Sequence, residues 1–317
     1  MASRPGLRSI AAASTSASRT FAPRFVPPTS RSFASTHPAS RPTTTTNDTS
    51  DRPTSFGFET VTESEKRERV AGVFSSVADS YDRMNDMMSL GVHRLWKDHY
   101  VSSLNPGYTP PGQAARPQHI LDIAGGTGDI AFRHLHTAHV LNRNPDVRVT
   151  ISDINPDMLE VGKKRSSILP ASQQAALSFL QANAEDLTGK VADNSMDLYT
   201  VAFGIRNFSN MPAALQEAHR VLKPGGVFAC LEFSKVGNAL LDSVYKRWSF
   251  GAIPMIGHLV AGDRDSYQYL VESIENFPSQ EDFRQLILDA GFGVAGQGYE
   301  DLTGGIAAIH RGIKPLA

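Results

Sequence analysis

Short apolar runs alternate with longer stretches of mixed polarity along the last two-thirds of the chain. Each run has the length and composition of a buried strand. The predicted strands cover residues 119–123, 147–152, 177–181, 196–203, 227–233, 293–299 and 306–310. The predicted helices between them cover residues 130–141, 212–222 and 280–290, with one more that starts at Asn155-Pro156. This alternation predicts an α/β fold with a seven-stranded, mainly parallel sheet and helices on both faces.

The segment before the sheet has a different pattern. Residues 69–88 and 93–104 are predicted to be helical, and the Pro- and Gly-rich stretch 105–117 is predicted to be a loop. We therefore divide the folded part into an N-terminal helical segment, residues 56–117, and a sheet domain, residues 118–317.

The first fifty residues have the composition of a targeting segment. They contain 19 Ser or Thr, six Pro, six Arg, no Lys and one acid, Asp48. Such a segment buries too little apolar surface to offset the entropy of ordering, so we expect 1–50 to be disordered. Arg-rich, Ser-rich, acid-poor termini are typical of organelle-import presequences, with a plain disordered tail as the alternative. The segment 31–35 (RSFAS) is similar to cleavage sites of mitochondrial presequences and predicts processing after Phe33.

Charge and cysteine content exclude several classes of function. The chain of 317 residues has a net charge of −1, and residues 51–317 alone have −6, a poor match to nucleic-acid phosphates. We therefore expect no nucleic-acid partner. Cys230 is the single cysteine, which excludes a disulfide framework and a cysteine-based zinc site. His, Asp and Glu form no cluster with ligand spacing, so we expect no metal.

A glycine-rich turn follows the first predicted strand. It reads Asp122-Ile-Ala-Gly-Gly-Thr-Gly-Asp129, and Gly126, Thr127 and Gly128 let a ligand approach the backbone at a helix start. On its own, this segment fits a dinucleotide, S-adenosylmethionine or a purely structural turn. In doubly wound sheets such ligands lie beyond the carboxyl ends of the strands.

Polar residues also follow the next two predicted strands. Asp153 ends the second strand, where a carboxylate can accept both hydrogen bonds of a ribose diol. Asn183-Ala184 and Asp186 follow the third strand, where they can meet an adenine edge; a loop acid or helix cap is the alternative for Asp186. Asp122 favours S-adenosylmethionine as the cofactor, because it attracts a cationic amino group and, with Asp129, repels a pyrophosphate. A dinucleotide-dependent oxidoreductase is the alternative enzyme.

Two longer signatures are far more specific. They are YDRMNDMMSLGVHRLW at 81–96 and RVLKPGGVFACLEFS at 220–234. Shorter supporting segments lie at 202–207, 265–267 and 302–312. Together they resemble the UbiE/Coq5 methyltransferase family, and the resemblance runs from about residue 74 to residue 314. Ala124 departs from the glycine that class I methyltransferases usually have at the start of the turn.

The resemblance implies the Rossmann-like fold of class I S-adenosylmethionine-dependent methyltransferases. It also implies C-methyl transfer to the ring of a prenylated benzoquinol, a 2-methoxy-6-polyprenyl-1,4-benzoquinol, in ubiquinone (coenzyme Q) biosynthesis. Carried over by motif, the family's cofactor-binding positions are Thr127, Asp153, Asn183 and Ala184. Ala202 stands where some bacterial members have Ser. A non-catalytic scaffold subunit of a quinone-synthesis complex is the non-enzyme alternative.

Methylation of a quinol ring requires groups that hold the ring and stabilise a phenolate. We predict that Arg206 and Asn207, after the fourth strand, face the ring, with Arg206 stabilising the phenolate or orienting a water; a salt-bridged surface arginine is the alternative. Tyr81 shares a predicted helical face with Asn85 in a segment that we expect to cover the site. His93 is a candidate base, with a hydrogen-bonded core histidine as the alternative.

A helical insertion at about 237–278 follows the fifth predicted strand. Its aromatic and basic residues over 240–259 predict a tunnel for a polyprenyl tail or a membrane-contacting surface, with core or dimer packing as the alternative. Because a prenylated quinol resides in lipid, we expect peripheral association with the matrix side of the mitochondrial inner membrane. The expected partners are the quinol, other enzymes of a coenzyme Q biosynthesis complex and a second copy of the chain.

Overall fold

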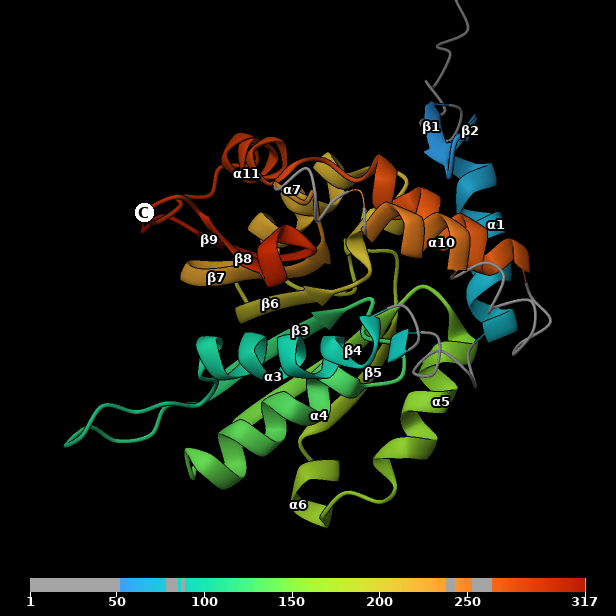
Figure 1. Ribbon diagram of the computed structural model, residues 1–317. Coiled ribbons are helices and arrows are strands. Elements are labelled where there is room, and N and C mark those ends of the chain that lie inside the picture. Colours follow the sequence, from blue (N-terminus) through green and yellow to red (C-terminus); the bar gives the residue numbers. More distant parts are fainter. Residues whose placement is uncertain are drawn as a thin grey trace, which may run out of the picture. The chain divides into compact units, whose positions relative to one another are not determined.

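A seven-stranded sheet forms the core of the unit that spans residues 48–317 (Figure 1). The computed structural model describes residues 52–77, 85–86, 89–237, 243, 245–252 and 264–316. The predictions for the first fifty residues, for Tyr81 and for most of the segment 240–259 lie outside these residues. The strand order is β5 (Leu177–Gln181), β4 (Val147–Asp153), β3 (Gln118–Ile123), β6 (Met196–Ala202), β7 (Leu222–Phe233), β9 (Ala307–Ile313) and β8 (Tyr299–Leu302). The first five strands in this order are parallel, and β9 is antiparallel to both β7 and β8. The predicted mainly parallel, seven-stranded sheet is confirmed.

Helices cover both faces of the sheet because successive strand residues point to opposite sides. In β3, Leu121 packs in the same core cluster as the helices α7 (Met211–Val221) and α11 (Gln280–Asp289). The neighbouring Ile120 belongs to the opposite cluster, with α4 (Asp129–Leu135) and α5 (Pro156–Ser166). Further helical segments are α3 (Val92–Leu104), α6 (Ala171–Gln174) and α10 (Arg264–Asn276), with a π-helical turn, η3 (His136–Leu141), continuing α4.

The last part of the chain differs from the expectation. The strand predicted over 293–299 is wrong, because β8 begins at Tyr299 and Gly293 makes an isolated bridge to Ile313 instead. Gly296 and Gly298 have φ values of 57° and 79°, which interrupt an extended strand. Alternating polarity alone does not reveal such a break.

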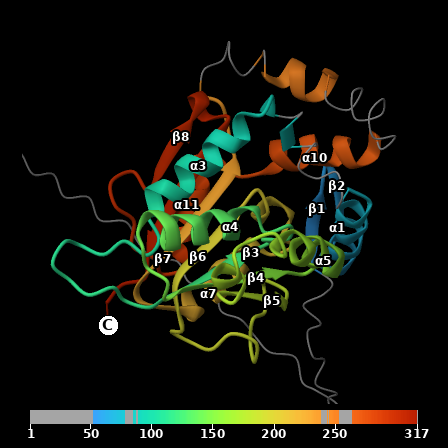
Figure 2. The ribbon, with the colours of Figure 1, turned by 90° about the horizontal axis from the view of Figure 1, so that it is seen from below.

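The N-terminal segment begins with a hairpin that the sequence pattern did not indicate. Strands β1 (Pro53–Phe56) and β2 (Glu59–Thr62) pair antiparallel and lead into α1 (Glu63–Val77), which starts six residues before the predicted helix. Phe56 stacks on Tyr269 of α10 with ring centroids 4.1 Å apart. In both ribbon views α1 lies beside α5 and close to the carboxyl ends of the central strands (Figures 1 and 2). Within the described ranges, no helix is long and apolar enough to cross a membrane.

Candidate active site

A cavity opens at the carboxyl ends of β3, β4, β5 and β6, where the order of the strands reverses along the chain. Its empty volume is about 1070 Å³, open solvent at its mouth included. Six of the seven predicted cofactor-binding residues line it, namely Asp122, Gly126, Thr127, Asp153, Asn183 and Ala184. The seventh, Gly128, does not line the cavity.

The glycine turn is shaped by close packing. Gly126 has a φ of 39°, and a Cβ there would lie 2.9 Å from Met158 Cε and 3.2 Å from Asp153 Oδ2. Gly128 precedes α4 with a φ of 83°, and a Cβ there would lie 2.5 Å from the Phe132 ring. Gly126 therefore keeps the cavity floor open, whereas Gly128 is required by the backbone and by Phe132.

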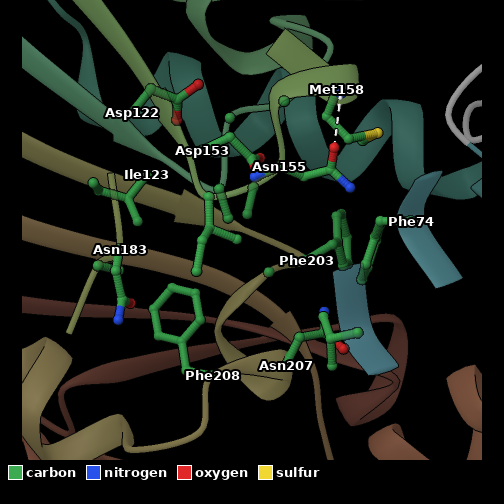
Figure 3. Close-up of a pocket in the computed structure, with 18 of the residues that line it drawn as sticks. Phe74, Asp122, Ile123, Asp153, Asn155, Met158, Asn183, Phe203, Asn207 and Phe208 are labelled. Carbon is green, nitrogen blue, oxygen red and sulfur yellow. Dashed lines mark hydrogen bonds between the residues drawn. The ribbon is translucent and has the colours of Figure 1, made fainter. Parts of the chain in front are cut away.

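Asp153 closes the β4 end of the cavity (Figure 3). Its Oδ1 accepts a hydrogen bond from the backbone N–H of Asn155, at 2.9 Å. Asn155 in turn caps α5, because its side-chain oxygen accepts the N–H groups of Asp157 and Met158. Burial raises the pKa of Asp153 to about 6, so the carboxylate is charged at neutral pH and suited to accept hydrogen bonds from a diol.

Asp122 lies at the opposite end of the turn, on β3. Its side chain is buried, and its Oδ1 accepts a hydrogen bond from the Thr200 hydroxyl at 2.8 Å. Its Oδ2 has no hydrogen-bond partner within the described part of the chain. Burial raises the pKa of Asp122 to about 7. A buried carboxylate oxygen of this kind, at the cavity wall, fits a ligand with a cationic donor.

The loop after β5 contributes the next group of residues. Asn183 and Ala184 line the cavity, and Asn183 Oδ1 accepts the backbone N–H of Glu185 at 3.0 Å. Asp186 does not line the cavity, and its carboxylate accepts the N–H of Thr188 instead. The adenine-edge prediction for Asp186 is therefore wrong. Glu185 lines the cavity in its place and accepts the N–H of Ser209 at 2.6 Å.

Arg206 is buried in an ion pair behind the cavity wall. Its Nη1 donates to Glu232 Oε1 at 2.7 Å and to the Phe203 carbonyl at 2.6 Å, and its Nε donates to Ser273 at 3.3 Å. The side chains of Arg206 and Glu232 are 0% and 1% exposed. The prediction of a guanidinium that faces the substrate ring is not met, because the carboxylate draws Arg206 away from the cavity that Asn207 lines.

Asn207 and His93 have contrasting positions. Asn207 lines the cavity, and its Oδ1 accepts a hydrogen bond from the Tyr269 hydroxyl at 3.0 Å. His93 does not line it; its Nε2 lies 2.9 Å from Asp86 Oδ1, and burial together with the nearby Lys97 lowers the pKa of His93. His93 therefore corresponds to the alternative of a hydrogen-bonded core histidine.

Several cavity residues were not singled out from the sequence. Phe74 of α1 and Phe208, which follows the turn after β6, point into the cavity (Figure 3). Lys97 of α3 also lines it, and its ammonium lies 2.7 Å from Asp129 Oδ2. Lys97 directly follows Trp96, the last residue of the 81–96 signature, but no local pattern shows that α3 turns Lys97 toward the glycine turn.

The chain is similar in sequence to known methyltransferases. The family model of the ubiE/COQ5 methyltransferase family matches residues 61–314. A relative from Schizosaccharomyces pombe, 2-methoxy-6-polyprenyl-1,4-benzoquinol methylase, mitochondrial, is 55% identical over 268 residues, with 84% of this chain and 86% of the relative covered. The human protein of the same name is 47% identical over 289 residues, covering 82% and 84%. The Brucella suis ubiquinone/menaquinone biosynthesis C-methyltransferase UbiE is 51% identical over 260 residues, covering 82% and 90%.

Solved structures support the fold at much lower sequence identity. A chain described as an O-methyltransferase from Nostoc punctiforme superposes with a TM-score of 0.51 and 13% identity, covering 76% of this chain and 60% of its own. A chain from the complex between the Haloferax volcanii Trm112 methyltransferase activator and its methyltransferase gives 0.50 and 17%, covering 76% and 97%. The architecture is that of class I methyltransferases.

Proposed function

The chain belongs to the ubiE/COQ5 methyltransferase family, and from this premise we propose that it methylates a ring carbon of a 2-methoxy-6-polyprenyl-1,4-benzoquinol in ubiquinone biosynthesis. The family and the fold imply S-adenosylmethionine as the donor, which supplies a reactive methyl group on a sulfonium. The observation that carries the proposal is the cavity at the strand-order reversal, with Asp153 at the β4 end and the buried carboxylate of Asp122 at the β3 end.

The cavity residues fit this cofactor by their chemistry. Asp153 binds the ribose diol, and Asn183 and Ala184 bind the adenine edge beside it. Gly126 and Thr127 bring the backbone against the middle of the ligand. Asp122 accepts a hydrogen bond from the cationic amino group through its Oδ2, the carboxylate oxygen that the Thr200 hydroxyl does not bind.

The acceptor side is built by the turn after β6. A quinol ring carbon becomes nucleophilic when its hydroxyl is deprotonated, so the site must hold the ring and stabilise an oxyanion. Because Tyr269 occupies the amide oxygen of Asn207, the amide N–H₂ is left to donate to a quinol oxygen. Arg206 acts as a positioning residue, since its bonds to Glu232 and the Phe203 carbonyl fix this turn. Alignment of donor and acceptor contributes up to about 7–11 kcal/mol in well-oriented systems.

Methylation is tested directly with the purified protein. A short-chain prenylated 2-methoxybenzoquinol, kept reduced, is incubated with S-adenosylmethionine, and the product is analysed by mass spectrometry and NMR. We expect the gain of one CH₂ at a ring carbon, and a strong loss of turnover with Asp153→Asn. Binding of NADH without binding of S-adenosylhomocysteine would support an oxidoreductase. Cofactor binding without turnover on any quinol would support a scaffold.

We also propose a mitochondrial location, since the relatives from S. pombe and human have mitochondrial names. A presequence cleaved after Phe33, peripheral contact with the matrix side of the inner membrane, and association with other coenzyme Q enzymes or a second copy are parts of this proposal. N-terminal sequencing of the protein recovered from mitochondria, with alkaline carbonate extraction of their membranes, tests it. A start at Met1 in a cytosolic fraction would contradict it.

A further inference from the structure

Lys97 is a buried cation at the cavity wall. Its side chain is 4% exposed, and its ammonium lies 2.7 Å from Asp129 Oδ2 and 5.8 Å from the centre of the Phe203 ring. Asp129 has a second cationic partner, because Arg133 Nε lies 3.1 Å from its Oδ1. Asp129 therefore retains a counter-ion if the Lys97 ammonium turns part of its hydrogen bonding toward a ligand.

Lys97 lies at the end of the cavity where the amino-acid part of the proposed cofactor would bind. Asp153 and Asn183, at the ends of β4 and β5, define the adenosine end under the proposed function. The rest of the ligand must then cross the glycine turn toward β3 and β6. Asp122 lies on β3, and Lys97 contacts Asp129 at the start of α4 and the face of Phe203 beyond β6. Both therefore flank the opposite, amino-acid end.

Among the described residues that line the cavity, one cationic side chain lies near the amino-acid end of the proposed cofactor. Arg67 and Lys97 are the two lysine or arginine residues among the described residues that line it. Arg67 lies 3.9 Å from Glu185, in the loop that holds Asn183 at the adenosine end. Lys97 is the cation on the side of Asp122.

We infer that Lys97 binds the carboxylate of the methionyl part of the cofactor, while Asp122 binds its amino group. This inference rests on the proposed function. The two residues form a pair of opposite charges that selects a zwitterionic end group over adenosine derivatives that lack it. The ion pair with Asp129 keeps the Lys97 ammonium charged although it is buried, and a charge-assisted hydrogen bond to a ligand carboxylate is strong in such a site.

The test uses three ligands and calorimetric titration. They are S-adenosylhomocysteine, its decarboxylated analogue and its deaminated analogue. Lys97→Met keeps an aliphatic side chain over Phe203 but removes the charge. We expect it to lower the affinity for S-adenosylhomocysteine and for the deaminated analogue about 10- to 100-fold. The affinity of this variant for the decarboxylated analogue should fall less than threefold, because that ligand has no carboxylate for Lys97 to bind. Lys97→Arg should restore most of the affinity for the two carboxylate ligands, because it restores the charge.

Matched variants separate the possible outcomes. Asp122→Asn should show the complementary pattern. It should lower the affinity for S-adenosylhomocysteine and the decarboxylated analogue, the two ligands that contain an amino group. Arg67→Met should affect all three ligands alike. If Lys97→Met weakens all three equally, Lys97 is structural and the inference is overturned, although the proposed function stands. If the wild-type protein binds none of the three, both fail. Thermal unfolding of each variant confirms that it is folded.

Discussion

The guanidinium of Arg206 and the carboxylate of Glu232 meet at 2.7 Å inside the protein, with both side chains fully buried. Glu232 lies near the end of β7, and Arg206 lies in the short turn after β6, so the pair joins neighbouring parallel strands at the edge where the cavity opens. Burial raises the pKa of Glu232, while Arg206 opposes that rise. The pair acts on the site through the shape of the turn that presents Asn207.

Breaking this pair should cost more than removing it. Arg206→Met leaves a buried carboxylate without its counter-charge, and we expect the free energy of unfolding to fall by about 3–5 kcal/mol. The double variant with Glu232→Gln should recover about half of that loss or more, because no buried charge remains. Urea unfolding measures both values. A double variant that is less stable than Arg206→Met would contradict the buried-pair interpretation.

Asp153→Asn should weaken binding of S-adenosylhomocysteine. The substitution keeps the shape of the side chain but removes the charge that accepts the two diol hydrogen bonds, so we expect a loss of about 10- to 100-fold in affinity. Asp186→Asn is the matched control, since Asp186 does not line the cavity and should change affinity less than twofold. Isothermal titration measures both. Equal losses in the two variants would contradict a specific role for Asp153 in binding the ligand.

Asp122 should make stability depend on pH. Its pKa is raised by burial from 3.8 to about 7, so the folded state binds this proton more tightly than the unfolded state. The free energy of unfolding should therefore fall as the pH rises from about 4 through about 7. Asp122→Asn should remove this pH dependence. Its free energy of unfolding should exceed that of the wild type by about 2–4 kcal/mol at pH 8 and by little at pH 4.

The matched comparison for this pH dependence is Asp153→Asn. Burial raises the pKa of Asp153 to about 6. The pH range over which Asp153 lowers the free energy of unfolding should therefore end about one pH unit below that of Asp122. Urea denaturation at intervals from pH 4 to pH 8 resolves the two pH ranges. A gain for Asp122→Asn that is constant over this range would contradict the assignment.

Tyr269→Phe should reduce turnover without weakening cofactor binding. It removes the hydroxyl that donates to Asn207 Oδ1, so the amide loses its fixed orientation toward the acceptor. We expect kcat to fall about tenfold while the affinity for S-adenosylhomocysteine changes less than twofold. Tyr108→Phe, at an exposed tyrosine, is the control. A fall in cofactor affinity equal to the fall in kcat would indicate a general structural effect instead.

The sequence pattern predicted the elements whose signals are local. The strand 177–181 and the Asn155 cap were predicted because apolar periodicity and cap chemistry depend on a few neighbouring residues. Gly296 and Gly298 interrupt the strand predicted before β8 through their backbone conformation, which a count of apolar residues does not detect.

Side-chain direction was harder to predict than position. Arg206 was placed correctly in the segment after β6, but the direction of its side chain depends on Glu232, 26 residues away along the chain. Lys97 reaches the cavity because α3 packs against α4, a tertiary contact without a local signature. Residues just after strands were therefore easier to place in the site than residues brought there by helix packing.

The hairpin that stacks on α10 also constrains the order in which the chain folds. Phe58 N–H donates to Glu272 across a sequence separation of 214 residues, and Phe56 stacks on Tyr269, the same residue that orients Asn207. Contacts of such long range require a large loop to close, which carries an entropic cost and slows folding. The hairpin precedes α10 along the chain, so its ring stack and its hydrogen bond to α10 cannot form before that helix is present. The acceptor half of the site is thus completed only when α10 packs against the turn after β6, and a chain that stops before α10 lacks the bond that orients Asn207.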